Sequence, residues 1–133
     1  MADIKFDVHY KQPPEKIWTA LTDSEKLAKW LMPNDFKPEL GREFKFRAKP
    51  MGGWDGIAHC KVIALDPPRM LAYSWESNMI KTVVRFTLEP DDGGTWLRFE
   101  QSGFEGWSGF WAKMFMGPGW RSKLKKSVPE LAQ

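Results

Sequence analysis

The stretch that decides the fold is the tail, residues 104–133, which reads FEGWSGFWAKMFMGPGWRSKLKKSVPELAQ. Its first half places large apolar side chains at the i, i+3, i+4, i+7 and i+8 spacing of one helix face: Trp107, Phe110, Trp111, Met114 and Phe115. Gly117-Pro118-Gly119 is predicted to break this helix. A second helix is predicted over residues 120–131, with a kink or early end at Pro129. Its apolar side consists of Trp120, Leu124, Val128 and Leu131.

An amphipathic helix of this kind is stable in water only when its apolar stripe is buried. The tail therefore needs a concave partner surface, which the remainder of the chain is expected to supply. On its pattern alone, an ordinary core helix is the simpler interpretation.

Length and composition favour one domain over residues 1–133 with a sizeable core. Eight Trp, nine Phe and two Tyr exceed what a core of this size needs, and they suggest a pocket wall as well. The net charge of +3 indicates a surface with both acidic and basic residues rather than the strongly basic surface of a nucleic-acid-binding protein. One basic cluster is interpreted as the solvated face of the last helix: Arg121, Lys123, Lys125 and Lys126. The single cysteine, Cys60, excludes an internal disulfide and favours the cytoplasm. No signal peptide or membrane span is recognisable, so no membrane partner is expected.

The remaining chain alternates between turns and periodic segments. A strand with period two is predicted over residues 3–11, followed by a helix that begins near Pro14. Thr22-x-x-Glu25 is predicted to form the capping box of a second short helix. Five strands follow in succession, which indicates an antiparallel meander curved around the tail helix. Their approximate ranges are 42–48, 57–65, 69–76, 83–89 and 95–102, and Asp91-Asp92-Gly93-Gly94 is a hairpin signal between the last two.

Four motifs occur in an order that resembles a known family. The segment VIALDPPRMLAYSW at residues 62–75 resembles the strand–DPPR–strand–W hairpin of the AHSA domain family. Pro14 with Ile17-Trp18 and Trp30 resemble its opening helices. Residues 83–104 resemble its F-x-L-x-P-x-x-G-G-T-x-L…G-F segment, and Gly119-Trp120 its last helix. The resemblance covers essentially the whole chain.

The resemblance implies the START-like (SRPBCC, helix-grip) fold. In that α+β fold, a curved antiparallel sheet of about six strands wraps around a long C-terminal helix, with two short helices after the first strand. The superfamily includes lipid carriers, hormone receptors, aromatic polyketide cyclases and chaperone regulators, so the fold does not assign a function. The family provides no shared catalytic residue to carry over.

The residue types present restrict the chemistry. His9, His59 and Cys60 do not make a zinc site, and no phosphate-binding loop or catalytic triad is recognisable, so neither a metal nor a cofactor is expected. His59, Tyr73 and Gln101 lie on strands expected to flank the cavity. They are interpreted as backbone-bonding groups, as groups that orient a ligand, or as groups that transfer a proton.

Three functions remain open. The first is non-catalytic binding of a small hydrophobic or aromatic molecule. The second, on the resemblance alone, is a stress-response module that regulates a heat-shock chaperone, and the third is a polyketide-cyclase-like enzyme. A monomer and a homodimer are both possible. The predicted ligand-binding residues are Trp30, Phe44, Phe46, Trp54, His59, Tyr73, Trp75, Phe86, Phe99, Gln101, Trp111, Phe115 and Trp120.

Overall fold

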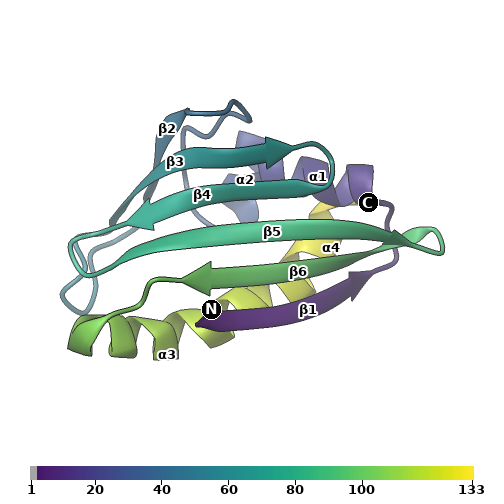
Figure 1. The fold of residues 1–133 in the computed structure, drawn as a ribbon. Helices are drawn as coiled ribbons and strands as arrows, with labels where there is room; N and C mark the ends of the chain where they lie inside the picture. Colours follow the sequence, from purple (N-terminus) through teal and green to yellow (C-terminus); the bar gives the residue numbers. More distant parts are fainter. Residues whose placement is uncertain (1–2) are drawn as a thin grey trace.

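The computed structural model describes residues 3–133, apart from the side chains of Trp107 and Ser108. Figure 1 shows the order of the elements along the chain. They are β1 (Ile4–Tyr10), α1 (Pro14–Thr22), α2 (Ser24–Trp30), β2 (Glu43–Arg47), β3 (Ile57–Asp66), β4 (Met70–Glu76), β5 (Lys81–Asp91), β6 (Gly94–Ser102), α3 (Gly106–Ser122), the π-helical segment η1 (Lys123–Ser127) and α4 (Val128–Leu131).

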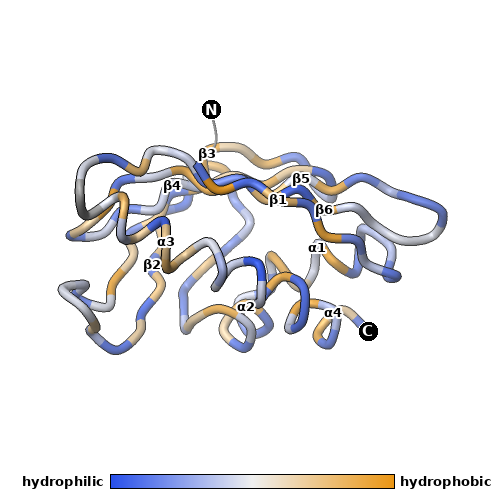
Figure 2. The backbone as a smooth tube through the Cα atoms, turned by 90° about the horizontal axis from the view of Figure 1, so that it is seen from below, coloured by the Kyte–Doolittle hydropathy of each residue, from blue (hydrophilic) through white to orange (hydrophobic). Residues whose placement is uncertain are grey.

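The strands form one antiparallel sheet in the order β1-β6-β5-β4-β3-β2. The helices all lie on one side of this sheet, as the view along its edge shows (Figure 2). The predicted α+β helix-grip fold is therefore confirmed, including the two short helices after the first strand and the long helical C-terminal segment.

The inner face of the sheet is built from alternate residues of each strand. In β1 the burial pattern alternates without exception, because successive side chains of a strand point to opposite faces. Phe6 pairs in register with Phe99, and their rings stack with centroids 5.2 Å apart. Phe99 in turn contacts Phe86 at 5.3 Å and Trp120 at 4.7 Å. These aromatic contacts attach the C-terminal helix to the sheet.

The predicted hairpin between β5 and β6 is confirmed. Asp91 pairs with Gly94, which leaves Asp92 and Gly93 as a two-residue loop. Both loop residues have positive φ, 49° and 86°, as a type I′ turn requires. The Asp-Gly pair suits these conformations, and the turn fixes the register of the two longest neighbouring strands.

The junction of α1 and α2 differs from the prediction in its capping residue. Thr22 belongs to α1, and its hydroxyl donates to the Trp18 carbonyl one turn earlier, at 2.8 Å. The cap of α2 is Asp23, whose carboxylate accepts from the Lys26 backbone N–H at 3.3 Å. The predicted capping box is therefore wrong, although the helix boundary is close to the predicted position.

The predicted break at residues 117–119 is also wrong, because α3 continues through Pro118 to Ser122. Pro118 lacks the N–H that would bond to the Met114 carbonyl, but both residues are exposed and water can hydrate that carbonyl. A proline on the solvent side therefore weakens the helix without ending it. The predicted stripe of Phe110, Trp111, Met114 and Phe115 is 50% to 76% exposed rather than buried, and the Trp107 side chain lies outside the described part of the chain.

The disturbance expected at Pro129 takes the form of the π-helical segment η1. Here the Val128 N–H donates to the Lys123 carbonyl, five residues earlier. In this register the partner of the Leu124 carbonyl would be Pro129, which has no N–H. The Tyr10 hydroxyl supplies the missing donor at 2.6 Å, and the Gln12 side-chain amide donates to the Pro129 carbonyl at 3.1 Å. The first strand and its following turn thus complete the hydrogen bonding of the last helix.

Replacing Tyr10 by Phe should lower the free energy of unfolding by about 1–2 kcal/mol, because it leaves the buried Leu124 carbonyl without a partner. Urea denaturation measures the change. In a Pro129→Ala background the restored N–H gives that carbonyl an intrahelical donor, so the Tyr10→Phe substitution should cost less. An equal cost in both backgrounds would show that the two groups are independent.

Stability should also fall at alkaline pH because of Cys60, which is buried and free. Burial, and then the nearby carboxylates of Glu76 and Asp35, raise the pKa of this thiol. The thiol ionises above about pH 8.5 only in the unfolded chain, so unfolding releases a proton there and stability falls as pH rises. Between pH 7 and about pH 9.5 the wild type should lose about 1 kcal/mol more than Cys60→Ala in urea denaturation. Parallel losses in the two proteins would contradict this assignment.

Candidate functional site

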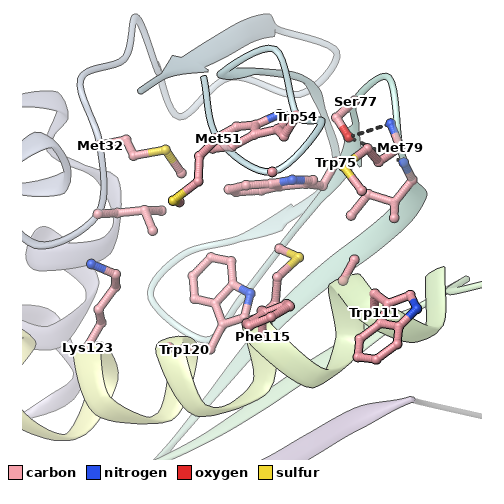
Figure 3. Close-up of a pocket in the computed structure, with 16 residues that line it drawn as sticks. Met32, Met51, Trp54, Trp75, Ser77, Met79, Trp111, Phe115, Trp120 and Lys123 are labelled. Atoms are coloured by element: carbon pink, nitrogen blue, oxygen red, sulfur yellow. Dashed lines mark hydrogen bonds between the residues drawn. The ribbon is translucent and has the colours of Figure 1, made fainter. Parts of the chain in front are cut away.

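A pocket of about 600 Å³ opens between α3 and the loops at one end of the sheet (Figure 3). Its lining is almost entirely apolar, and aromatic rings and methionines supply most of it. The lining residues are Leu31, Met32, Met51, Gly52, Trp54, Trp75, Ser77, Met79, Ile80, Trp111, Ala112, Phe115, Met116, Gly119, Trp120 and Lys123.

One wall of the pocket is a single face of α3 and η1. Trp111, Phe115, Gly119 and Lys123 follow one another at intervals of four residues, and Ala112, Met116 and Trp120 form a parallel row beside them. Residues four apart are neighbours on a helix surface, so the two rows make a continuous ridge. The ridge requires helix on both sides of Pro118, and therefore depends on the absence of the predicted break.

The opposite wall consists of two loops that are fastened to each other. The β2–β3 loop contributes Met51, Gly52 and Trp54, and the β4–β5 loop contributes residues 77, 79 and 80. Asn78 joins the loops, since its Nδ2 donates to the Gly53 carbonyl at 2.8 Å and its Oδ1 accepts from the Asp55 N–H at 3.3 Å. The wall is thus held by hydrogen bonds at the loop tips and not by strand pairing.

A buried chain of hydrogen bonds holds two tryptophans of the pocket. The Trp120 indole N–H donates to Gln101 Oε1 at 2.9 Å, and Gln101 Nε2 donates to Thr82 Oγ1 at 2.9 Å. The Thr82 hydroxyl donates to the Trp75 carbonyl at 3.0 Å. The Trp75 and Trp120 rings meet edge to face at 5.5 Å. Four elements, α3, β6, β5 and β4, are tied together through this chain.

The structure brings together five of the predicted ligand-binding residues at the pocket: Trp54, Trp75, Trp111, Phe115 and Trp120. Six others are buried in the hydrophobic core and do not line it: Trp30, Phe44, Phe46, Tyr73, Phe86 and Phe99. They pack against one another, as in the edge-to-face pair Phe44–Tyr73 at 5.2 Å. Sequence alone did not separate the two groups because both consist of large aromatic side chains, and which neighbour covers each of them depends on the tertiary structure.

The predicted polar group of His59, Tyr73 and Gln101 is not assembled at the pocket. His59 is exposed, since Ala58, Cys60 and Val62 take the inward positions of β3 and leave the intervening residues on the outer face. Tyr73 is buried, and burial raises the pKa of its hydroxyl. Gln101 is buried behind the wall, where its amide bonds to Trp120 and Thr82.

Sequence reasoning missed the aliphatic and sulfur-containing part of the lining. Four of the seven methionines, at positions 32, 51, 79 and 116, line the pocket. Three of them lie in connections between elements, where an apolar residue has no helix or strand period to reveal it. The only indication in the sequence was that two of them stand beside Pro or Gly residues, which interrupt helices and strands, in Met32-Pro33 and Pro50-Met51-Gly52.

Few polar groups face the pocket. Ser77 and Lys123 are the polar and charged side chains of the lining, and the Ser77 hydroxyl oxygen accepts from the N–H groups of Met79 and Ile80 at 3.1 and 3.3 Å. The lining as described includes no Asp, Glu, His or Cys. Within residues 3–133 as described, no cluster of three such side chains could hold a metal ion, and no helix is long and apolar enough to cross a membrane.

Comparison with solved structures shows close relatives of the fold. Protein MLL2253 from Mesorhizobium loti is 35% identical, with a TM-score of 0.83 over 96% of this chain and 95% of its own. Protein BH1534 from Bacillus halodurans is 27% identical, with a TM-score of 0.80 over 98% and 96%. The Aha1 dimer from Colwellia psychrerythraea is 28% identical, with a TM-score of 0.75 over 91% and 89%.

No curated protein matches the sequence. The family model described as "Activator of Hsp90 ATPase homolog 1-like protein" matches residues 11–130, which is nearly the whole of the fold described above. The chain belongs to this family, the activator of Hsp90 ATPase homolog 1-like proteins.

Proposed function

We propose that the protein binds a small hydrophobic or aromatic molecule in the pocket and does not act on it chemically. The observation that carries this proposal is a cavity of about 600 Å³ whose lining is apolar and contains no acidic or histidine side chain. Ligand sites are concave, mostly apolar and few per protein, and this pocket has that character. General acid–base chemistry would need a titratable group beside the ligand, and Lys123 alone does not form an acid–base pair.

The size and composition of the pocket suit an aromatic ligand of about two rings. A two-ring aromatic molecule that removes roughly 300 Å² of apolar surface from water gains roughly 7 kcal/mol, before the cost of ordering is subtracted. Met32, Met51, Met79 and Met116 add adaptability, because unbranched thioether side chains can repack around ligands of different shape. These residues favour a range of related ligands over a single one.

A cytoplasmic location is part of the proposal. Cys60 is the only cysteine and is free and buried, as is usual for proteins of reducing compartments.

A second candidate function is binding to a heat-shock chaperone, and a separate observation favours it. Phe110, Trp111, Met114 and Phe115 are half or more exposed on α3, and contiguous exposed apolar residues often mark interaction sites. The family description names activation of the Hsp90 ATPase, and the relative from Colwellia psychrerythraea is a dimer. The exposed stripe could therefore contact a chaperone or a second copy of this chain.

Gly119→Leu should abolish ligand binding without destabilising the fold. Gly119 lines the pocket, and a Cβ built there meets no atom within 4 Å, so the new side chain fills the cavity without displacing backbone. Leu is a better helix former than Gly by roughly 0.5–1 kcal/mol, so the melting temperature should hold or rise. Binding of N-phenyl-1-naphthylamine, an uncharged fluorescent probe, should weaken at least tenfold, about 1.4 kcal/mol.

Ser122→Leu is the matched control, because it adds the same side chain to an exposed position of α3 outside the pocket. It should leave probe affinity unchanged. Failure of the wild type to bind the probe, or equal binding by wild type and Gly119→Leu, would refute the pocket as the site.

Substitutions on α3 can distinguish the two candidate functions experimentally. Phe110 and Met114 are exposed and do not line the pocket, so the double substitution Phe110→Ser and Met114→Ser should leave probe binding intact. If the stripe contacts Hsp90, calorimetric titration of purified chaperone should show at least tenfold weaker binding by this variant. Unchanged chaperone affinity would exclude the stripe as the contact surface.

A further inference from the structure

Among the described residues, Lys123 is the one charged side chain that lines the pocket. It stands at the last position of the ridge that begins at Trp111, where α3 passes into η1. In Figure 3 its amine points from the helix toward the side of the pocket where Met32 and Met51 lie, opposite the end occupied by Ser77 and Met79. Among the described residues, the Lys123 ammonium has no ion pair or hydrogen bond.

The surroundings of the pocket favour an anion over a cation. The lining contains no carboxylate. The two acidic side chains next in sequence to lining residues are already engaged, since Asp55 accepts from the Ile57 N–H at 3.1 Å and Glu76 pairs with Lys81 at 3.5 Å. The Trp75 indole N–H, which has no partner in the described part of the chain, is a further donor at the lining. A ligand with acceptor oxygens would thus find donors in the Lys123 ammonium and the Trp75 indole N–H.

The shape of the ridge indicates an elongated ligand. From Trp111 to Lys123 the helix rises by about 18 Å, at 1.5 Å per residue. The positive charge lies at one end of this length, and apolar side chains occupy the remainder. One ammonium group can neutralise one negative charge, whereas phosphate groups are more commonly bound by several donors or by the planar fork of Arg.

We propose that the pocket takes an elongated apolar molecule with a single terminal carboxylate, and that the Lys123 ammonium binds this carboxylate. The apolar part of the ligand lies along the ridge between Trp111 and Gly119, against the methionines of the opposite wall. Lys123 therefore determines which end of the ligand enters and selects acids over alcohols and amines of the same length. This assignment rests on the proposed function of the pocket as a ligand site.

The test compares dodecanoate, dodecanol and dodecylammonium below their micelle concentrations, by tryptophan fluorescence and calorimetry at about pH 8, where the carboxylate of dodecanoate is ionised. The wild type should bind dodecanoate most tightly and dodecylammonium most weakly. Lys123→Met keeps a similar unbranched side chain and should weaken dodecanoate about five- to tenfold while leaving dodecanol within twofold. Lys123→Arg should restore most of the preference, because it restores the charge.

Lys125→Met is the matched control. It removes the same charge from the same helical segment but does not line the pocket, so the preference for dodecanoate should persist. If dodecanol binds the wild type but the acid has no advantage, or if Lys123→Met weakens acid and alcohol equally, the carboxylate site is refuted and the apolar pocket stands. If none of the three compounds binds, both the carboxylate site and the proposed ligand-binding function of the pocket are refuted.

Discussion

The structure depends on how one indole N–H is satisfied inside an apolar interior. Trp120 is buried at the centre of the helix–sheet interface, where an unpaired donor would cost roughly 1–3 kcal/mol. Gln101 meets that requirement and is itself held by Thr82, so a single residue on α3 sets the position of the helix over three adjacent strands. The aromatic contacts of Trp120 with Phe99 and Trp75 then fix its ring plane. The depth of the pocket follows from this arrangement, because Trp75 and Trp120 form part of its lining.

The two halves of the C-terminal helical segment have different roles because they bury different faces. From Trp120 onward, Leu124 and Val128 are buried in the hydrophobic core, and the first strand and its turn complete the backbone hydrogen bonds of the last turns. Among the described side chains of α3 before Trp120, no comparable apolar row is buried, and the large side chains at 110, 111, 114 and 115 are half or more exposed. The buried half anchors the helix, and the exposed half contributes most of the helical wall of the pocket.

Sequence patterns predicted the fold well because strands and hairpins have local signatures. The alternation of Ile4, Phe6, Val8 and Tyr10 and the Asp92-Gly93 turn are both confirmed by the structure. The lining of the pocket could not be predicted from such local patterns. Whether Phe86 or Trp75 reaches a cavity depends on which neighbour covers it, and that is a tertiary property. The continuation of α3 through Pro118 was missed for the same reason, since the effect of a helical proline depends on whether the carbonyl it leaves unpaired faces water.

Trp111 and Phe115 belong to two surfaces at once. Both line the pocket, and both contribute to the exposed stripe on α3. Under the two proposed functions, a molecule in the pocket and a macromolecule on the stripe would both contact these rings, so each binding event would change the rotamer freedom and the solvent exposure available to the other. Thermodynamic linkage makes such an effect reciprocal: whatever factor the small molecule imposes on the affinity for the macromolecule, the macromolecule imposes on the affinity for the small molecule. If both proposed functions hold, these two side chains couple the ligand site to the macromolecular contact surface.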